Sequence, residues 1–112
     1  MATITGTSGN DTIQPGLVSP GVTGGTPTAG DDSIQGLAGN DSIDGGDGND
    51  TIDGGSGSDS LRGGGGNDLV IIGLNSEDID YAYGDAGNDE LQGRTSPSAL
   101  STALPVTGRL AA

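Results

Sequence analysis

Residues 36–71 read GLAGNDSID GGDGNDTID GGSGSDSLR GGGGNDLVI, which are four consecutive units of nine residues in one register. The preceding segment 27–35, PTAGDDSIQ, keeps the second half of the same pattern. Each unit has an aspartate at its sixth position and a large aliphatic residue two positions later. The sixth-position aspartates are Asp32, Asp41, Asp50, Asp59 and Asp68. A period repeated this often indicates a repeat protein, in which each unit packs against its neighbours.

Two outlying copies extend the repeat toward both ends of the chain. They are GTSGNDTIQ at 6–14, with Asp11, and GDAGNDELQ at 84–92, with Asp89. Each aspartate lies 21 residues from its neighbour, which we interpret as two nine-residue steps and three further residues. The second gap then contains a degenerate unit with a slip between Glu77 and Asp80, whereas the first gap reads as a loop or distorted turn. We expect loop insertions at about 15–26 and 72–83 within a repeat domain spanning 1–92.

The composition narrows the classes of function. The chain of 112 residues has 16 acidic residues against three Arg, no His and no Cys, and its formal net charge is −13. Three Arg cannot neutralise a phosphate track, and no apolar run is long enough to span a bilayer, so we expect no nucleic-acid partner and no membrane insertion. The usual zinc and iron ligands and nucleophile–histidine pairs are missing. Abundant carboxylate and glycine instead suit a hard cation such as Ca²⁺.

Each unit divides into a turn and a short strand. The glycine-rich first six residues can bend sharply. The last three place one aliphatic side chain between two mostly polar ones, which is the alternation of a strand. The aliphatic residues are Ile13, Ile34, Ile43, Ile52, Leu61, Val70, Ile79 and Leu91. If two units make one coil, successive units alternate between two parallel sheets, and the aliphatic columns form a core one residue wide.

This pattern resembles the GGxGxDxUx nonapeptide of RTX (haemolysin-type) calcium-binding proteins, where U is a large aliphatic residue. The resemblance covers residues 6–92. It implies an all-β fold, a parallel β-roll or right-handed β-solenoid, with calcium between the stacked turns. It also implies that the sixth-position aspartates and the carbonyls of the turns hold each ion.

On such a roll, turns of the same edge are eighteen residues apart. One edge carries Asp32, Asp50 and Asp68, and the other carries Asp41, Asp59 and Glu77. The intervals between these turns predict about four Ca²⁺ ions, with Asp11, Asp80 and Asp89 as further ligands at the irregular ends. The turn glycines expected at the sites are Gly30, Gly36, Gly39, Gly45, Gly46, Gly48, Gly54, Gly55, Gly57, Gly63, Gly64 and Gly66. The alternative is that the aspartates only form turns and confer solubility.

The apolar content predicts that folding depends on the cation. Leu, Ile, Val and Phe make up 21 of the 112 residues, just under the fifth that, with high net charge, is typical of disordered chains. Repulsion between stacked carboxylates also opposes folding. A cation that binds only the folded form relieves the repulsion and stabilises the fold by mass action. We therefore expect an expanded chain that folds when Ca²⁺ binds.

Two surface features suggest association between copies. The segment around Leu69, Ile71, Tyr81 and Tyr83 is apolar, and it is either covered by the tail or by residues 72–83, or it forms a subunit interface. A short roll without a cap also exposes a strand edge and half-built turns at each end. Calcium bridging such ends would join copies head to tail into filaments or sheets.

Residues 93–112 leave the repeat and form a tail without acidic residues. The tail reads either as a type I secretion signal or as a strand docked on the roll. The first residues lack the charged and apolar regions of a Sec signal peptide. The resemblance thus implies type I export and an extracellular or cell-surface location.

Together these observations predict a secreted, non-catalytic, calcium-binding structural protein that self-assembles, with the cell surface as a further contact. One alternative is an accessory or secretion module of a larger secreted enzyme or adhesin. A second is a ligand-binding sheet face for ice or glycans.

Overall fold

The computed structural model describes residues 2–72, 81–93, 106–107 and 109–111, with side chains up to residue 92. All regular secondary structure in these ranges is β, as the repeat predicts. The strands are β1 (Thr3–Thr5), β2 (Thr12–Gln14), β3 (Leu17–Val18), β4 (Ser33–Gln35), β5 (Ser42–Asp44), β6 (Thr51–Asp53), β7 (Ser60–Arg62), β8 (Leu69–Ile72), β9 (Tyr81–Tyr83), β10 (Glu90–Gly93), β11 (Val106–Thr107) and β12 (Arg109–Ala111). No helix in this described part could cross a membrane.

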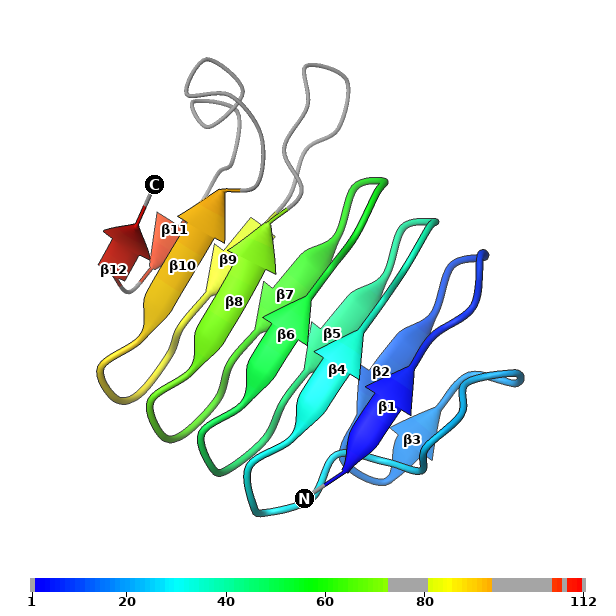
Figure 1. Ribbon diagram of the computed structural model, residues 1–112, viewed down its shortest axis with the longest axis horizontal. Coiled ribbons are helices and arrows are strands. Elements are labelled where there is room, and N and C mark those ends of the chain that lie inside the picture. Colours follow the sequence, from blue (N-terminus) through cyan, green and yellow to red (C-terminus); the bar gives the residue numbers. More distant parts are fainter. Residues whose placement is uncertain (1, 73–80, 94–105, 108, 112) are drawn as a thin grey trace.

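Successive units of the repeat alternate between two sheets (Figure 1). Within the described residues, sheet 1 has the strand order β1-β4-β6-β8-β10-β12 and sheet 2 has the order β11-β9-β7-β5-β2-β3. Neighbouring strands pair in parallel throughout, except β2 with β3. In the regular part Ile34 pairs with Ile52 and Ile52 with Val70, so equivalent residues are 18 apart. Two nine-residue units therefore make one coil.

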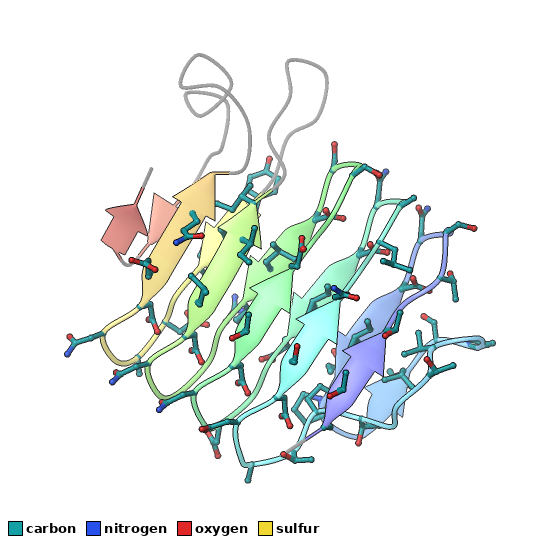
Figure 2. The ribbon with its side chains drawn as sticks, viewed as in Figure 1. Atoms are coloured by element: carbon teal, nitrogen blue, oxygen red, sulfur yellow. The ribbon has the colours of Figure 1, made fainter. Side chains whose placement is uncertain are left out.

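The core consists of the middle residues of the strands, which face one another between the two sheets (Figure 2). Sheet 1 contributes Ile4, Ile34, Ile52, Val70 and Leu91, and sheet 2 contributes Ile13, Ile43, Leu61 and Ala82. Together with Ile72, each of these side chains is at most 2% exposed. Each coil of the regular part adds only two large side chains, so the core stays thin and gives limited hydrophobic stabilisation.

Ile4 was not among the expected core residues. It lies in β1, nine residues before Ile13, and pairs with Ile34. The nine-residue spacing could have identified it, but the residues before Ile4 carry none of the glycines that mark a turn.

The segment 15–26 is more than the predicted loop. Its strand β3 pairs antiparallel with β2, and Thr23 forms an antiparallel bridge with Thr5 through hydrogen bonds of 3.0 and 2.9 Å. Ile13 pairs with Ile43, so the offset here is 30 residues rather than 18. The gap between Asp11 and Asp32 is thus one nine-residue step plus twelve inserted residues, and the predicted two steps plus three is wrong.

These antiparallel contacts close the N-terminal end of both sheets. β3 lies along the outer edge of sheet 2, and Thr23 lies along the outer edge of sheet 1 (Figure 1). A further parallel coil would need the edges that they occupy. The outer edges of β2 and of Thr5 are therefore occupied at this end, and β3 becomes the terminal strand of sheet 2.

At the other end, two strands of the tail extend the sheets. β11 pairs in parallel with β9, and β12 pairs in parallel with β10. In the preceding coil Ala82 pairs with Leu61, so Ala82 takes the core position that the period of nine assigned to Ile79. Ile79 itself lies outside the described residues.

The expected apolar surface is divided between two faces. Leu69 and Ile71 belong to β8 in sheet 1, where both are half-buried. Tyr81 and Tyr83 belong to β9 in sheet 2. The middle residue of each strand points into the common core, so these flanking residues face outward on opposite sides. The prediction of one apolar region is therefore wrong. On the outer face of sheet 2, Tyr83 is instead near a charged group, since the Arg62 guanidinium lies 5.4 Å from its ring centroid.

Candidate metal centre

The glycine-rich turns stack in two rows, one on each edge of the sheets (Figure 1). The first row, which leads into sheet 1, contains the turns 27–32, 45–50, 63–68 and 84–89. The second row, which leads into sheet 2, contains the turns 6–11, 36–41 and 54–59 in the described residues. The rows therefore bring together aspartates that lie 18 to 30 residues apart in the sequence, as the period of the repeat predicts for the regular part.

A ladder of aspartates runs along each row. Every sixth-position aspartate is between 1 and 4% exposed. In the first row the backbone N–H groups of Ala2, Asp32, Asp50 and Asp68 donate to Oδ1 of Asp32, Asp50, Asp68 and Asp89, at 2.7–2.9 Å. In the second row the N–H groups of Asp11 and Asp41 donate to Oδ1 of Asp41 and Asp59, both at 2.8 Å. One carboxylate oxygen thus links each turn to the preceding one.

The second carboxylate oxygen has a different environment. Oδ2 of Asp41, Asp50, Asp68 and Asp89 is buried and has no hydrogen-bond donor within the protein. Leaving a buried carboxylate oxygen without a partner costs about 1–3 kcal/mol or more. Four such oxygens at equivalent positions indicate a partner that is not a protein side chain.

Each of these oxygens borders a space that a glycine keeps open. A Cβ on Gly36 would lie 2.6 Å from Oδ2 of Asp41 and 2.7 Å from the carbonyl oxygen of Gly54, in the next turn of the row. A Cβ on Gly45 would lie 2.6 Å from Oδ2 of Asp50 and 2.9 Å from the carbonyl oxygen of Gly63. A carboxylate of one turn and a carbonyl of the next thus converge on the space between them.

Burial also raises the pKa of these carboxyl groups. Desolvation is the main cause at Asp41 and Asp68, whose pKa rises to about 6, and at Asp50, whose pKa rises to about 7. Neighbouring carboxylates raise these pKa values further, while backbone N–H donors oppose the shift. A cation between the turns would reverse both unfavourable contributions, because it neutralises the carboxylates and replaces their lost hydration.

The donor set fits a hard cation. In the described residues no three acidic side chains gather into one cluster, so an ion would take most of its ligands from backbone carbonyls. Ca²⁺ accepts six to eight oxygen ligands in flexible geometry, from carboxylates and carbonyls alike. Stacked turns supply both kinds of oxygen.

Glycines at the second and fourth positions let the turns stack in contact. Gly46, Gly48, Gly64 and Gly66 all have φ between 84° and 100°. A Cβ on Gly66 would meet the carbonyl group of Gly48, with its carbon at 2.7 Å. No side chain fits in this contact, which explains why the repeat requires glycine there.

Asparagines at the fifth position form a second ladder. The N–H groups of Asn40, Asn67 and Asn88 donate to Oδ1 of Asn10, Asn49 and Asn67, at 2.7–2.9 Å. Asparagine is a residue type suited to a left-handed backbone. Here, however, the φ values of these asparagines are not positive, and their side chains bridge the turns instead.

The predicted site residues are thus partly assembled. Asp41, Asp50, Asp59, Asp68 and Asp89 take equivalent places in the ladders, and the predicted glycines line the turns. The repeat also contains Gly6 and Gly84 at the first position, which the prediction omitted although their register identifies them. Glu77 and Asp80 lie outside the described residues.

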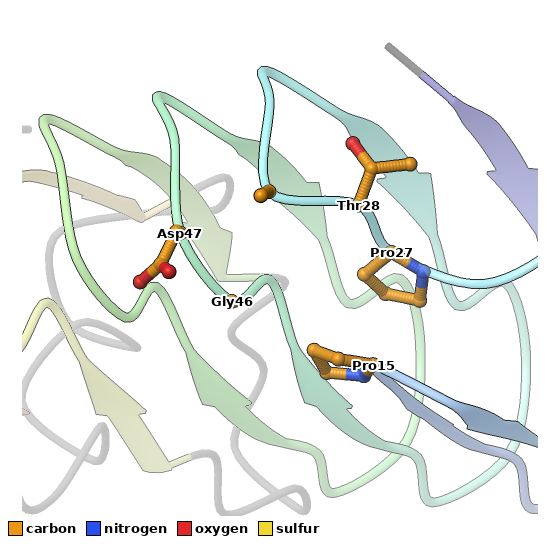
Figure 3. A pocket seen from close by; sticks show the side chains of 6 residues that line it. Pro15, Pro27, Thr28, Gly46 and Asp47 are labelled. Carbon is orange, nitrogen blue, oxygen red and sulfur yellow. The ribbon is translucent and has the colours of Figure 1, made fainter.

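A shallow hollow of about 340 Å³ lies beside the first row (Figure 3). Pro15, Pro27, Thr28, Ala29, Gly46 and Asp47 line it. Asp47 is the single ionisable side chain among these six, so the hollow brings no acid–base pair together. Pro15 lies close to Gly46, since a Cβ on Gly46 would lie 3.0 Å from its Cγ.

The chain matches the family model of the RTX calcium-binding nonapeptide repeat in four copies, at residues 3–14, 27–61, 47–74 and 75–95. These matches cover most of the chain, and the protein therefore belongs to the RTX calcium-binding nonapeptide-repeat family. The resemblance seen in the sequence is confirmed. No curated protein and no solved structure matches the chain significantly. The family supports calcium as the bound ion, while the ligands and the number of ions stay predictions.

The raised pKa values predict how stability depends on pH without calcium. The folded carboxyls of Asp41, Asp50 and Asp68 bind protons more tightly than the unfolded chain, where the pKa is about 3.8. Protonation therefore stabilises the fold, fully below about pH 4, and this stabilisation is lost as the pH rises through 6 to 7. In chelator, the β-sheet signal in circular dichroism should increase as the pH is lowered from 8 to 5.

Asp50→Asn should flatten this pH dependence, and Asp47→Asn, at an exposed aspartate of the same turn, should not. A β-sheet signal that decreases on acidification over this range would contradict the prediction.

Proposed function

We propose that the protein is a parallel β-roll, a right-handed β-solenoid, that binds Ca²⁺ between its stacked turns and folds as it binds. The observation that carries this proposal is the row of buried Oδ2 atoms without a protein donor, each facing a glycine-lined space. Asp41, Asp50, Asp68 and Asp89 are the proposed carboxylate ligands, and Asp59 joins them by its register. The carbonyl oxygens of the next turn supply further ligands.

Charge and burial support folding that is coupled to calcium. The chain has a net charge of −13, and its folding buries a column of carboxylates behind a thin aliphatic core. Each bound Ca²⁺ neutralises two charges, and an ion that binds only the folded form stabilises it by RT ln(1 + [L]/Kd). Calcium thus supplies free energy that the core alone does not.

We propose a non-catalytic structural role outside the cell. The proposed dependence of folding on calcium and the membership of the RTX family support this role. The alternative, an accessory module of a larger secreted enzyme or adhesin, places the same calcium-loaded roll beside another domain. A catalytic activity that copurifies with this chain and requires its residues would favour the alternative.

Assembly between copies stays a prediction, and the antiparallel contacts of 15–26 argue for a narrower form of it. The antiparallel contacts of 15–26 close the N-terminal end, so head-to-tail stacking through two open ends lacks one partner. β11 and β12 are the last strands of their sheets at the opposite end. We therefore propose that any assembly pairs two C-terminal ends, which yields dimers rather than filaments.

Sedimentation velocity in chelator, in Ca²⁺ and in Mg²⁺ tests this proposal. We expect a slowly sedimenting, expanded chain in chelator and a compact species in Ca²⁺. Mg²⁺ at the same concentration should compact the chain less, because it demands octahedral geometry and keeps its waters. No compaction in Ca²⁺ would overturn the proposal. Species larger than dimers that dissolve in chelator would show filament assembly and would overturn the restriction to one end.

A further inference from the structure

The second residue of the turn differs between the two ends of each row. In the turns 36–41, 45–50, 63–68 and 84–89 this residue is Leu37, Gly46, Gly64 or Asp85. In the first turn of each row it is a threonine, Thr7 in 6–11 and Thr28 in 27–32. Figure 3 shows Thr28 on the first turn of its row, beside the turn that carries Gly46 and Asp47. The two threonines are 21 residues apart and lie on opposite edges, so they are independent instances of one arrangement.

Each threonine donates hydrogen bonds to both carboxylate oxygens of the aspartate in its own turn. The Thr7 N–H donates to Oδ2 of Asp11 at 2.6 Å, and the Thr7 hydroxyl donates to Oδ1 at 2.9 Å. The Thr28 N–H and hydroxyl donate to Oδ2 and Oδ1 of Asp32 at 2.7 and 2.8 Å. The N–H groups of Gly9 and Gly30 donate to the two hydroxyl oxygens, both at 3.0 Å, which orients each hydroxyl proton toward the carboxylate.

The backbone explains why only threonine does this. Leu37 and Asp85 have φ values of 69° and 63°, so the second residue is left-handed even where it is not glycine. In the turns 6–11 and 27–32 no residue adopts a left-handed φ. A β-branched residue such as threonine is strongly disfavoured at a left-handed φ. Threonine therefore selects the other turn conformation, in which its N–H points at the carboxylate.

Aspartates in turns with a left-handed second residue differ from those in the two threonine turns in how their Oδ2 atoms are hydrogen-bonded. Asp41, Asp50, Asp68 and Asp89 keep an Oδ2 without a protein donor, and their turns all have a left-handed second residue. Asp11 and Asp32 have protein donors on both oxygens. At Asp32, burial raises the pKa, but the hydrogen bonds from Ala2 and Thr28, together with the positive charge of the N-terminus, outweigh it and the pKa is lowered. The carboxylate is thus stabilised in its charged form by groups of the protein itself.

We propose that the residue at the second position decides whether a turn takes a calcium ion, and that Thr7 and Thr28 replace the ion in the first turn of each row. This inference rests on the proposed calcium function and specifies which aspartates serve it. Asp11 and Asp32, which the repeat predicts as ligands, are structural groups that begin each ladder. At 27–32 the first residue is Pro27, whereas the turns 36–41 and 45–50 begin with Gly36 and Gly45.

The two threonine turns are placed where a fixed end of the stack of coils is needed. They lie in the first coil beside the segment 15–26, which closes the edges of both sheets. A turn that needs no ion can form a fixed end on which the calcium-dependent coils stack. The N-terminal end would otherwise contain half-built sites, each with ligands on one side only.

The test counts bound Ca²⁺ per folded chain by equilibrium dialysis in four single variants and the unaltered chain. Leu37→Thr should lose one ion, because the new threonine satisfies Asp41. Leu37→Ala is its control, since Leu37 already carries a Cβ, and it should keep the native number. Thr7→Gly should gain one ion, because Gly6 retains the same space beside Asp11. Ser8→Gly, at an exposed position of the same turn, is its control and should bind the native number.

Equal ion numbers in each variant and its control would overturn this inference while leaving the proposed function intact. If Leu37→Thr does not fold in Ca²⁺, the comparison of Thr7→Gly with Ser8→Gly decides. If the unaltered chain binds no Ca²⁺, the proposed function fails and this inference fails with it.

Discussion

Replacing Asp50 by alanine is expected to lower the free energy of unfolding in Ca²⁺ by about 2–4 kcal/mol and to remove one bound ion. Asp50 is 1% exposed and occupies the middle of its row. Its Oδ1 accepts the N–H of Asp32 at 2.9 Å, and its Oδ2 faces the space beside Gly45. Alanine removes an ion ligand and leaves the buried N–H of Asp32 without an acceptor. Urea unfolding and calcium titration, both followed by circular dichroism, measure the two losses.

Asp50→Asn separates these two effects. The amide keeps an oxygen that can accept the N–H of Asp32, but it removes the negative charge and places an NH₂ group where the cation would bind. We expect this variant to lose one ion, as the alanine variant does. At saturating Ca²⁺ it should be more stable than Asp50→Ala by about 1 kcal/mol, the contribution of the retained hydrogen bond.

Asp47→Ala is the matched control in the same turn. Asp47 is exposed and is not part of the aspartate ladder, so its removal should leave the ion number and the unfolding midpoint nearly unchanged. Equal effects of the Asp47 and Asp50 substitutions would mean that the buried ladder has no special role.

Gly66→Ala is expected to destabilise the calcium-loaded fold by about 2–5 kcal/mol. Gly66 has a φ of 100°, and its Cβ would meet the carbonyl group of Gly48 and lie 2.9 Å from Oδ1 of Asn49. The neighbouring atoms belong to a backbone held by the coil beneath, so they cannot move aside cheaply. The first row should separate at this point, which would weaken the ion sites on both sides of Gly66.

Gly25→Ala controls for the conformational part of this effect. Gly25 has a φ of 92°, but no atom lies within 4 Å of the position of its Cβ. The Gly25→Ala substitution should therefore lower the free energy of unfolding only by the cost of a left-handed alanine, about 1–2 kcal/mol. Chemical unfolding in Ca²⁺ compares the two variants directly. A loss as small in Gly66→Ala as in Gly25→Ala would show that the turns do not stack as closely as the structure indicates.

The regular part of the fold could be predicted from the sequence because its information is local and periodic. An aliphatic residue every nine positions defines the strand centres from Ile34 to Val70. The aspartate two residues earlier identifies the buried ladder from Asp32 to Asp68. Each coil contacts mainly its neighbours, so the period alone determines which residues meet.

The irregular ends could not be predicted in this way, because insertions break the period. The sequence indicated that 15–26 leaves the repeat, yet only the tertiary contacts showed the antiparallel pairing of β3 and the bridge from Thr23 to Thr5. Likewise, Leu69 and Tyr81 look like one apolar segment along the chain, but alternate strands belong to opposite sheets.

By itself, the sequence determined the class of this protein, the identity of its calcium-binding repeat and the set of aspartates among which we propose its ligands. The tertiary structure decided how these aspartates differ. Asp11 and Asp50 have the same position in the repeat, but Thr7 donates to both oxygens of Asp11, whereas Oδ2 of Asp50 has no protein donor. The difference depends on the φ of one turn residue, because that angle determines whether a backbone N–H points at the carboxylate.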